Sequence, residues 1–282
     1  MKTGKKTVLI LMMIFFCFPC GLWGAEEDPT VKADAALIYD MDQGTVLWEK
    51  NSDAPMAPAS LIKVLNLLTA EPYLSFDDEI VVGPLAQTVY NGQLMGLAAG
   101  DVVKAEDLVY AMMLFSANDA AVALADELTG SISFYAALMD TKAWALGAVR
   151  TTSVNVNGYS EEEQKTTAYD LAVIGAAYMD NERLAPFASA ESHTLRWLTP
   201  KKEREIANIN KFLYSYEGAT GLKTGTTSMA GKCLMATVEK NGKRYLAVAL
   251  NSSDRYGDCM RMMDYAYREG GVLSAEIVDD ME

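Results

Sequence analysis

Ser60-Leu61-Ile62-Lys63 opens an apolar run that continues to Ala70 and is typical of a helix. A serine and a lysine three residues apart on a helix lie on the same face, about one turn apart. A serine hydroxyl is a poor nucleophile unless a base stands beside it, and this spacing brings an amine within reach. Because the chain has a single histidine, in a polar stretch, lysine is the base that the sequence favours. Taken alone, the pattern also fits a capping serine beside a solvated lysine.

A second short polar group, Ser116-Ala117-Asn118, lies between two segments with helical periodicity, Lys104 to Phe115 and Asp119 to Leu128. A loop at this break can project two short polar side chains into a cleft. The alternative is that Ser116 or Asn118 caps the second helix, as ordinary helix starts require. Both interpretations are compatible with one another.

A third group, Lys223-Thr224-Gly225-Thr226, lies on a predicted strand, residues 221–227. A lysine and a threonine on an exposed edge strand are common and need no function. The glycine favours another interpretation, because glycine inside a strand often marks the close approach of a ligand or of another backbone. We therefore expect this edge to be able to pair with an extended peptide.

S-x-x-K, S-x-N and K-T-G in this order form the signature of the penicillin-recognising serine acyl enzymes. From about Ala33 to Gly271 the chain resembles the serine-type D-Ala-D-Ala carboxypeptidases, which are low-molecular-mass penicillin-binding proteins. Asn208-Ile209-Asn210 supports the resemblance, which covers nearly the whole chain after its N-terminal segment.

The order of predicted elements indicates an α+β fold. Two strands that form a hairpin come first, a long helical middle follows, and three strands and a helix close the chain. The predicted strands are 35–40, 45–49, 221–227, 232–239 and 244–250, and the helices are 61–70, 104–115, 119–128, 133–146, 168–179 and 256–268. Runs of strands and of helices favour an antiparallel sheet in which the hairpin lies beside the last strands, with a helical lobe inserted between them. The resemblance implies a β-lactamase/transpeptidase-like fold.

The resemblance implies roles for the catalytic side chains. Ser60 attacks the carbonyl between two D-alanines, and Lys63 must be neutral to accept its proton. Burial and a nearby positive charge both lower a lysine pKa, and Lys223 can supply that charge. Ser116 relays a proton to the leaving amine, and Asn118 holds Lys63 and the substrate amide.

Four further positions are implied to bind the substrate, and the backbone of Ser60 takes part. Thr224 hydrogen-bonds the terminal carboxylate on the strand that carries Gly225. The backbone N–H groups of Ser60 and Thr226 hold the oxyanion, aided by the helix dipole. Arg255 is the candidate for a nearby cation. The implied partners are the D-Ala-D-Ala end of a peptidoglycan stem peptide and β-lactams as covalent inhibitors, and no cofactor or metal is implied.

Two other functions compete with this one. A class A β-lactamase shares the fold and motifs but needs a glutamate in an E-x-x-L-N context to activate the deacylating water, and the chain has no such sequence. A wall-binding pseudoenzyme would keep the cleft and lose the chemistry, and the three intact motifs argue against it. The net charge of −14 gives the chain no electrostatic reason to bind nucleic acid.

The first 25 residues resemble an export signal rather than part of the fold. A basic start precedes an apolar, uncharged stretch, residues 7–23, which Gly24-Ala25 ends. We expect a cleaved signal over residues 1–25, with an uncleaved N-terminal anchor as the alternative and as the one route to a membrane. A catalytic domain over 33–271 and a short acidic tail over 272–282 then complete an extracytoplasmic enzyme of the cell wall or periplasm.

Two details stay open at this level. Cys233 and Cys259 can form one disulfide, or they can be two buried thiols. Residues 91–95 fall where the family often has a serine-containing loop, which puts the substrate contacts of that loop in doubt.

Overall fold

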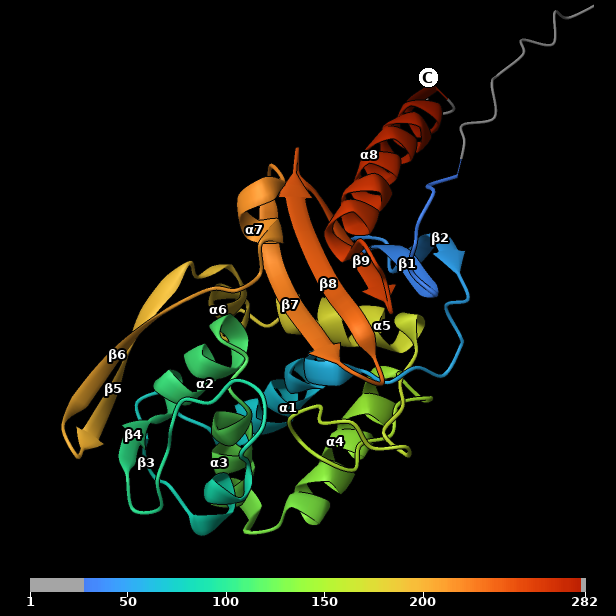
Figure 1. Cartoon of the computed structure of the whole chain (residues 1–282). Helices are drawn as coiled ribbons and strands as arrows, with labels where there is room; N and C mark the ends of the chain where they lie inside the picture. The colour runs from blue at the N-terminus through green and yellow to red at the C-terminus, as the bar shows by residue number, and fades with distance from the viewer. Residues whose placement is uncertain (1–27, 280–282) are drawn as a thin grey trace, which may run out of the picture.

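The first and last strands of the chain meet in one antiparallel sheet. The computed structural model describes residues 28–279. The order of the five strands is β2-β1-β9-β8-β7, and β1 pairs with β9 so that Ala36 lies opposite Ala249. The strands are β1 (Ala35–Asp40), β2 (Thr45–Lys50), β7 (Ala219–Thr227), β8 (Gly231–Lys240) and β9 (Lys243–Leu250). The predicted sheet is confirmed, and β7 is an edge strand as expected (Figure 1).

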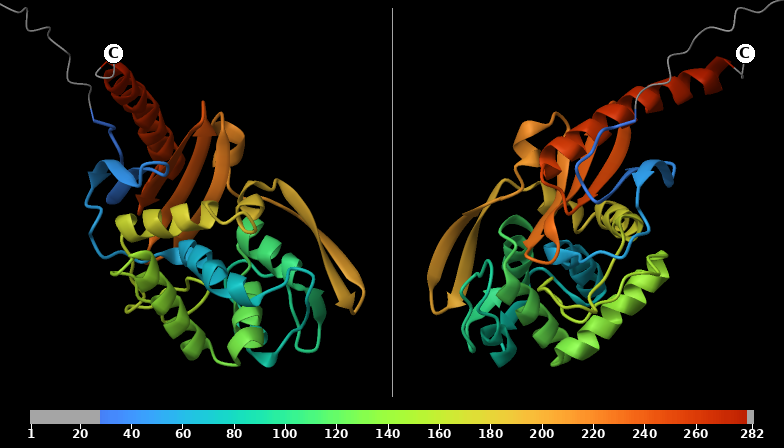
Figure 2. Two further views of the ribbon diagram at one scale, coloured as in Figure 1. Left: turned by 180° about the vertical axis from the view of Figure 1, so that it is seen from behind. Right: turned by 45° about the vertical axis from the view of Figure 1, so that its right-hand side comes forward.

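Both faces of this sheet are buried because alternate side chains of a strand point to opposite faces. In β1, Leu37 joins the larger core cluster and Ile38 joins the smaller one. Helix α8 (Arg255–Asp279) covers the smaller cluster, and α5 (Ala168–Met179) packs on the opposite face (Figure 2). The strands therefore read as nearly continuous apolar runs.

The helical lobe surrounds one fully buried helix. Every residue of α1 (Ile62–Ala70) is buried, because α2, α3, α4 and α5 all pack against it. Six of its nine residues are apolar, as a buried helix requires, and the polar Lys63, Asn66 and Thr69 all make hydrogen bonds. The remaining long helices are α2 (Ala105–Leu114), α3 (Asn118–Thr129) and α4 (Ile132–Leu146), and all agree with the predicted ranges to within one or two residues. Two short helices, α6 (Ala185–Ser189) and α7 (Phe212–Ser215), were not predicted.

A second antiparallel sheet, β3-β4-β5-β6, was also missed. Its strands are β3 (Glu79–Val81), β4 (Val102–Lys104), β5 (Ser192–Thr199) and β6 (Lys202–Ala207). β3 and β4 have three residues each, and β6 is mostly exposed and charged. None of these three strands therefore shows the alternating apolar pattern by which a strand is recognised. The β5–β6 hairpin extends along the side of the helical lobe (Figure 1).

The two ends of the chain differ from the prediction. Helix α8 runs on to Asp279, so its predicted end at Arg268 is wrong, and most of the expected tail is helical. Glycine costs only about 1 kcal/mol inside a helix, and Gly270-Gly271 does not interrupt this one. The expected signal over residues 1–25 lies outside the described residues. Among residues 28–279, none of the helices combines the length and the apolar character that a membrane span requires.

Candidate active site

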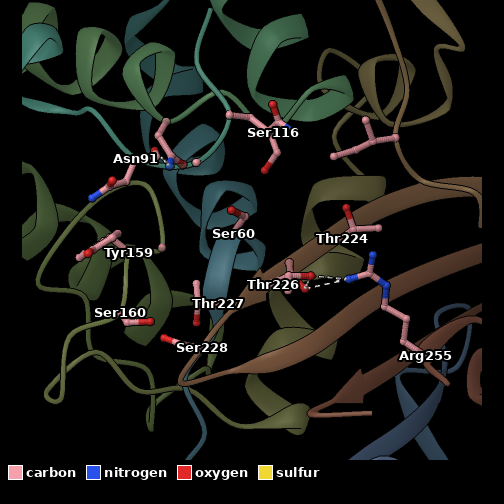
Figure 3. A pocket seen from close by; sticks show the side chains of 16 residues that line it. Ser60, Asn91, Ser116, Tyr159, Ser160, Thr224, Thr226, Thr227, Ser228 and Arg255 are labelled. Carbon is pink, nitrogen blue, oxygen red and sulfur yellow. Dashed lines mark hydrogen bonds between the residues drawn. The ribbon is translucent and has the colours of Figure 1, made fainter. Parts of the chain in front are cut away.

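The predicted site residues meet in a cleft of about 530 Å³ between the edge strand β7 and the loops of the helical lobe (Figure 3). Seven of the nine predicted residues line this cleft: Ser60, Ser116, Asn118, Thr224, Gly225, Thr226 and Arg255. The other two, Lys63 and Lys223, are buried. Ser60 lies in the middle of the view, between Ser116 on one side and Thr226 on the other.

Ser60 sits in a tight turn that two glycines enclose. The turn is a single 3-10 turn, Ala59–Leu61, directly before α1. A Cβ atom on Gly158 would lie 2.0 Å from the Ala59 carbonyl oxygen, and one on Gly225 would lie 3.1 Å from the Ser60 nitrogen. The predicted close approach at Gly225 is thus real, and the approaching backbone is that of the nucleophile. Only glycine lets both neighbours come this near.

Lys63 is poised as a neutral amine. Its Nζ atom lies 3.0 Å from Ser60 Oγ and 2.7 Å from Asn118 Oδ1, and it also contacts the Asn157 carbonyl oxygen. A neutral amine has two N–H bonds and one lone pair. The two oxygens that can only accept, those of Asn118 and Asn157, take the two protons, and the lone pair is left for the Ser60 hydroxyl.

The surroundings of Lys63 favour this uncharged form. The side chain is fully buried, and its pKa lies well below the usual value, first because of burial and then because of the positive charge of Lys223. The carboxylate of Asp119 acts in the opposite direction. Within residues 28–279, no ion pair includes Lys63. The expected dependence on Lys223 is therefore present, although burial is the larger cause.

Ser116 has a strained backbone and a hydroxyl group free for chemistry. Its φ of 64° is left-handed, which a residue with a side chain rarely adopts and which often marks a functional position. Within the described chain its hydroxyl makes no hydrogen bond, and it points into the cleft on the side of Ser60 (Figure 3). Capping is not its role: the N-cap of α3 is Ala117, and no side chain caps that helix.

The β7 side of the cleft carries the positive charge. Arg255 Nη1 donates to Thr226 Oγ1 and to the Gly225 carbonyl oxygen, each at 2.9 Å. Lys223 is 1% exposed, and burial together with the neighbouring Arg255 charge lowers its pKa to about 7. The Arg255 side chain, which the resemblance implies as a nearby cation, therefore lies beside the strand that holds Thr224 and Thr226.

Several contributors were missed because they act through the backbone. Asn157 offers its carbonyl oxygen to Lys63, and Asn91 accepts from Asn118 Nδ2 at 2.8 Å. A backbone group leaves no residue-type signal, although the pair Asn157-Gly158 does indicate a turn. Among the residues that the structure describes, no aspartate or glutamate lines the cleft.

The single histidine and the two described cysteines lie elsewhere. His193 Nε2 is 2.7 Å from Asp107 Oδ1, and its ring stacks on Tyr110 at 3.8 Å. Neither partner lines the cleft. Cys233 and Cys259 are both free and buried, so the disulfide alternative is wrong.

Comparison with known proteins gives one consistent result. A family model described as D-alanyl-D-alanine carboxypeptidase matches residues 24–254. The carboxypeptidase DacF of Bacillus subtilis is 29% identical over 95% of this chain and 72% of its own length. DacC of Escherichia coli is 32% identical over 86% of this chain and 63% of its own.

Solved structures agree with the sequence relatives. A D-alanyl-D-alanine carboxypeptidase of Mycobacterium tuberculosis superposes with a TM-score of 0.81 at 28% identity, covering 87% of this chain and 95% of that one. A point mutant of a Streptomyces DD-transpeptidase gives 0.81 at 26% identity, over 86% of this chain and all of that one. The predicted transpeptidase-like fold is confirmed, and the chain belongs to the D-alanyl-D-alanine carboxypeptidase family.

Proposed function

We propose that this chain is a serine D-Ala-D-Ala carboxypeptidase that removes the last D-alanine of a peptidoglycan stem peptide through an acyl-enzyme on Ser60. The observation that carries the proposal is the hydrogen-bond pattern of Lys63. In the neutral form its two N–H groups donate to the oxygens of Asn118 and Asn157, which leaves the lone pair for the Ser60 hydroxyl, whose Oγ lies 3.0 Å from Nζ. Lys63 removes the hydroxyl proton as Ser60 Oγ forms its bond to the carbonyl carbon.

The terminal carboxylate of the substrate binds at the β7 side of the cleft. Arg255 and Lys223 supply positive charge there, and Thr224 supplies a hydroxyl group. The substrate runs along β7 as an added strand, because no strand within residues 28–279 lies beyond this edge. The N–H groups of Ser60 and Thr226 then stabilise the oxyanion.

Proton transfer to the leaving amine completes acylation. Ser116 passes a proton from Lys63 to the nitrogen of the departing D-alanine, and its unbonded hydroxyl is free to do so. Water then attacks the ester carbonyl with Lys63 as the base, which releases the trimmed peptide and restores Ser60. A transpeptidase uses the same ester with an amine in place of water.

In the part of the chain that the structure describes, the cleft lacks the glutamate on which a class A β-lactamase depends. Deacylation in that class depends on a glutamate beside the ester, and no carboxylate lines this cleft in the described chain. Penicillin therefore acylates Ser60 and leaves slowly. Rapid turnover of penicillin without release of D-alanine from a D-Ala-D-Ala peptide would overturn the proposal.

The direct test is mass spectrometry of a stem pentapeptide before and after treatment with the purified chain. We expect the loss of one alanine, together with covalent labelling of the chain by fluorescent penicillin. Ser60→Ala should abolish both signals, whereas Ser189→Ala, at an exposed position of α6, should keep both. A Ser60→Ala variant that still releases alanine would exclude Ser60 as the nucleophile, and a wild-type chain that releases none would favour a pseudoenzyme.

The proposed place of action is outside the cytoplasm. Residues 1–25 act as an export signal, and the catalytic domain spans 33–271. Attachment to a membrane, where it occurs, runs through an uncleaved N-terminal segment. Edman sequencing or mass spectrometry of the mature N-terminus distinguishes cleavage after Ala25 from an intact anchor.

A further inference from the structure

Two consecutive residues at the start of α3 hold one loop of the cleft. This loop, residues 91–97, is called the cleft loop below, and its first three residues line the cleft. Asn118 donates its backbone N–H to the Gln93 carbonyl oxygen at 2.8 Å and its Nδ2 to that of Asn91, also at 2.8 Å. The tip of the loop therefore contacts the same side chain that holds Lys63.

Asp119 grips the other end of the cleft loop. Its Oδ1 accepts from Met95 N at 2.8 Å, and its Oδ2 accepts from Gly96 N at 2.7 Å and Leu97 N at 3.0 Å. Asp119 is 2% exposed, and no ion pair of the described chain includes it. A buried carboxylate without a cation needs such N–H donors, and the N-terminus of α3 adds a favourable dipole.

The position of the cleft loop, which the hydrogen bonds to Asp119 fix, controls the orientation of the Asn118 amide. Its Oδ1 accepts from Lys63, so its Nδ2 must find another partner, and the Asn91 carbonyl oxygen at the loop tip is that partner. The fit is close: a Cβ atom on Gly92 would lie 2.6 Å from Asn118 Nδ2. If the loop moved away, the amide would lose the contact that keeps its oxygen on Lys63.

Arg204, on β6, holds the cleft loop from outside. Its Nη1 donates to the Leu94 carbonyl oxygen at 2.9 Å, and its guanidinium lies over the Phe115 ring at 4.5 Å. The Asp119 carboxylate thus accepts from N–H groups of the cleft loop, and the Arg204 guanidinium donates to its carbonyl groups. The β5–β6 hairpin is connected to the site through this contact.

We propose that Asp119 is a positioning residue, which latches the cleft loop onto α3 and so orients Asn118 toward Lys63 and the substrate, with Arg204 as the outer half of the latch. The inference rests on the proposed function of Asn118 and Lys63. It assigns no contact between Asp119 and the substrate.

Asp119→Asn is the main test, with Asp126→Asn as its matched control. Whichever way the new amide turns, its NH2 group faces N–H donors of the loop or of Ala120, because both oxygens of Asp119 are in use. Asp126 lies on the same helix, and its carboxylate accepts instead from Leu85 N at 3.3 Å. We expect kcat/KM to fall about 10- to 100-fold in Asp119→Asn, since a misplacement near 1 Å has that size of effect, and to change less than about twofold in the control.

The pH profile tests whether the Asp119 carboxylate acts on Lys63, which a loss of stability alone would not show. The charges that act on Lys63 are Lys223 from β7 and Asp119 from α3, and Asp119 raises its pKa. Removal of that carboxylate lowers the pKa of Lys63 further, so the acid limb of kcat/KM moves to lower pH. An Asp119→Asn variant that folds and keeps its kcat/KM would overturn the proposal, wherever its acid limb lies.

Arg204→Met keeps the inference testable if Asp119→Asn does not fold. Arg204 is exposed, and Arg196 on β5, which pairs with Glu203, is its matched control. We expect a loss of about 3- to 10-fold for Arg204→Met and none for Arg196→Met, because both lose a charged contact but only Arg204→Met loses a hydrogen bond to the cleft loop. Equal activity of the two would contradict the latch. The same variants can be compared by the rate at which penicillin acylates Ser60. This readout tests the role of Asp119 and Arg204 even if the chain releases no D-alanine.

Discussion

The two walls of the cleft differ in charge. The β7 wall holds two cations, Arg255 at its surface and Lys223 within it, the latter with a pKa near 7. The wall formed by the helical lobe holds Ser60, Ser116 and a lysine that burial keeps neutral. Both lysines are buried, yet only Lys63 has carbonyl acceptors for both of its amine protons.

This difference in charge separates substrate binding from proton removal within one cleft. Binding a carboxylate requires charge, whereas removing a hydroxyl proton requires an amine that has none. The two walls place these opposite requirements on opposite sides of Ser60. Changes on the lobe wall should therefore reduce the chemical step, and changes on the β7 wall should weaken binding of the terminal carboxylate.

The largest expected effect comes from Lys63→Arg. A guanidinium stays charged at every accessible pH, so the base is lost, and general-base catalysis contributes up to about 10⁴-fold. We expect kcat to fall by about 10³-fold or more, and penicillin labelling to fall with it. Lys104→Met, at an exposed lysine paired with Asp77, is the control that should keep full activity. Normal labelling of a folded Lys63→Arg variant would contradict the role of the lobe wall.

A smaller effect is expected from Arg255→Met. Loss of a charge-assisted hydrogen bond to the carboxylate is worth about 1.5–3 kcal/mol, or roughly 10- to 100-fold in KM. A peptide whose terminal carboxylate is replaced by an amide should show the same KM with both enzymes. If Arg255→Met weakens the amide peptide equally, the β7 wall does not recognise the carboxylate.

Titration of Lys63 and of Lys223 should affect opposite limbs of the pH dependence of activity. Activity requires neutral Lys63, so kcat/KM rises as pH rises through its lowered pKa. Lys223 loses its proton as pH rises through its pKa of about 7, which weakens carboxylate binding. KM for the carboxylate peptide should therefore increase several-fold above about pH 7, as steady-state kinetics across the pH range will test. Lys223→Met should remove this rise, and persistence of the rise would assign it to another group.

The smallest effect is a gain in stability from Ser116→Gly. Glycine adopts a left-handed φ freely, so the folded state loses strain of about 1 kcal/mol, part of which the greater entropy of the unfolded chain offsets. We expect a rise of about 1–2 °C in Tm together with reduced activity. Ser116→Ala should lose activity without the gain in Tm. A Ser116→Gly variant that melts no higher than the wild type would contradict the expected gain in stability.

The sequence predicted those parts of the site that depend on side-chain type. Ser60, Lys63 and Lys223 can be recognised because each lies in a short motif of fixed residue types and spacing, and their helix or strand follows from apolar periodicity. The main sheet was equally predictable, since its strands are long and apolar. Arg255 could be placed only as a nearby cation.

The parts of the site that the sequence did not predict depend on backbone groups and on contacts between residues far apart in the chain. The carbonyl groups of Asn157 and Asn91 are available from any residue type, so nothing in the sequence marks them. The latch at Asp119 depends on a loop more than twenty residues earlier in the chain. The second sheet was missed because two of its strands have three residues and because β6 is polar.

The pairing of β1 with β9 has a consequence for how the chain folds. Ala35 lies opposite Leu250, so the strand made first is completed by a strand made more than two hundred residues later. Such distant pairing has a high entropic cost and slows folding. The main sheet cannot join β1 to β8 and β7 until the chain has been made as far as β9, which lies between them. Catalytic competence is therefore acquired late, once the strand that ends at Leu250 has been made.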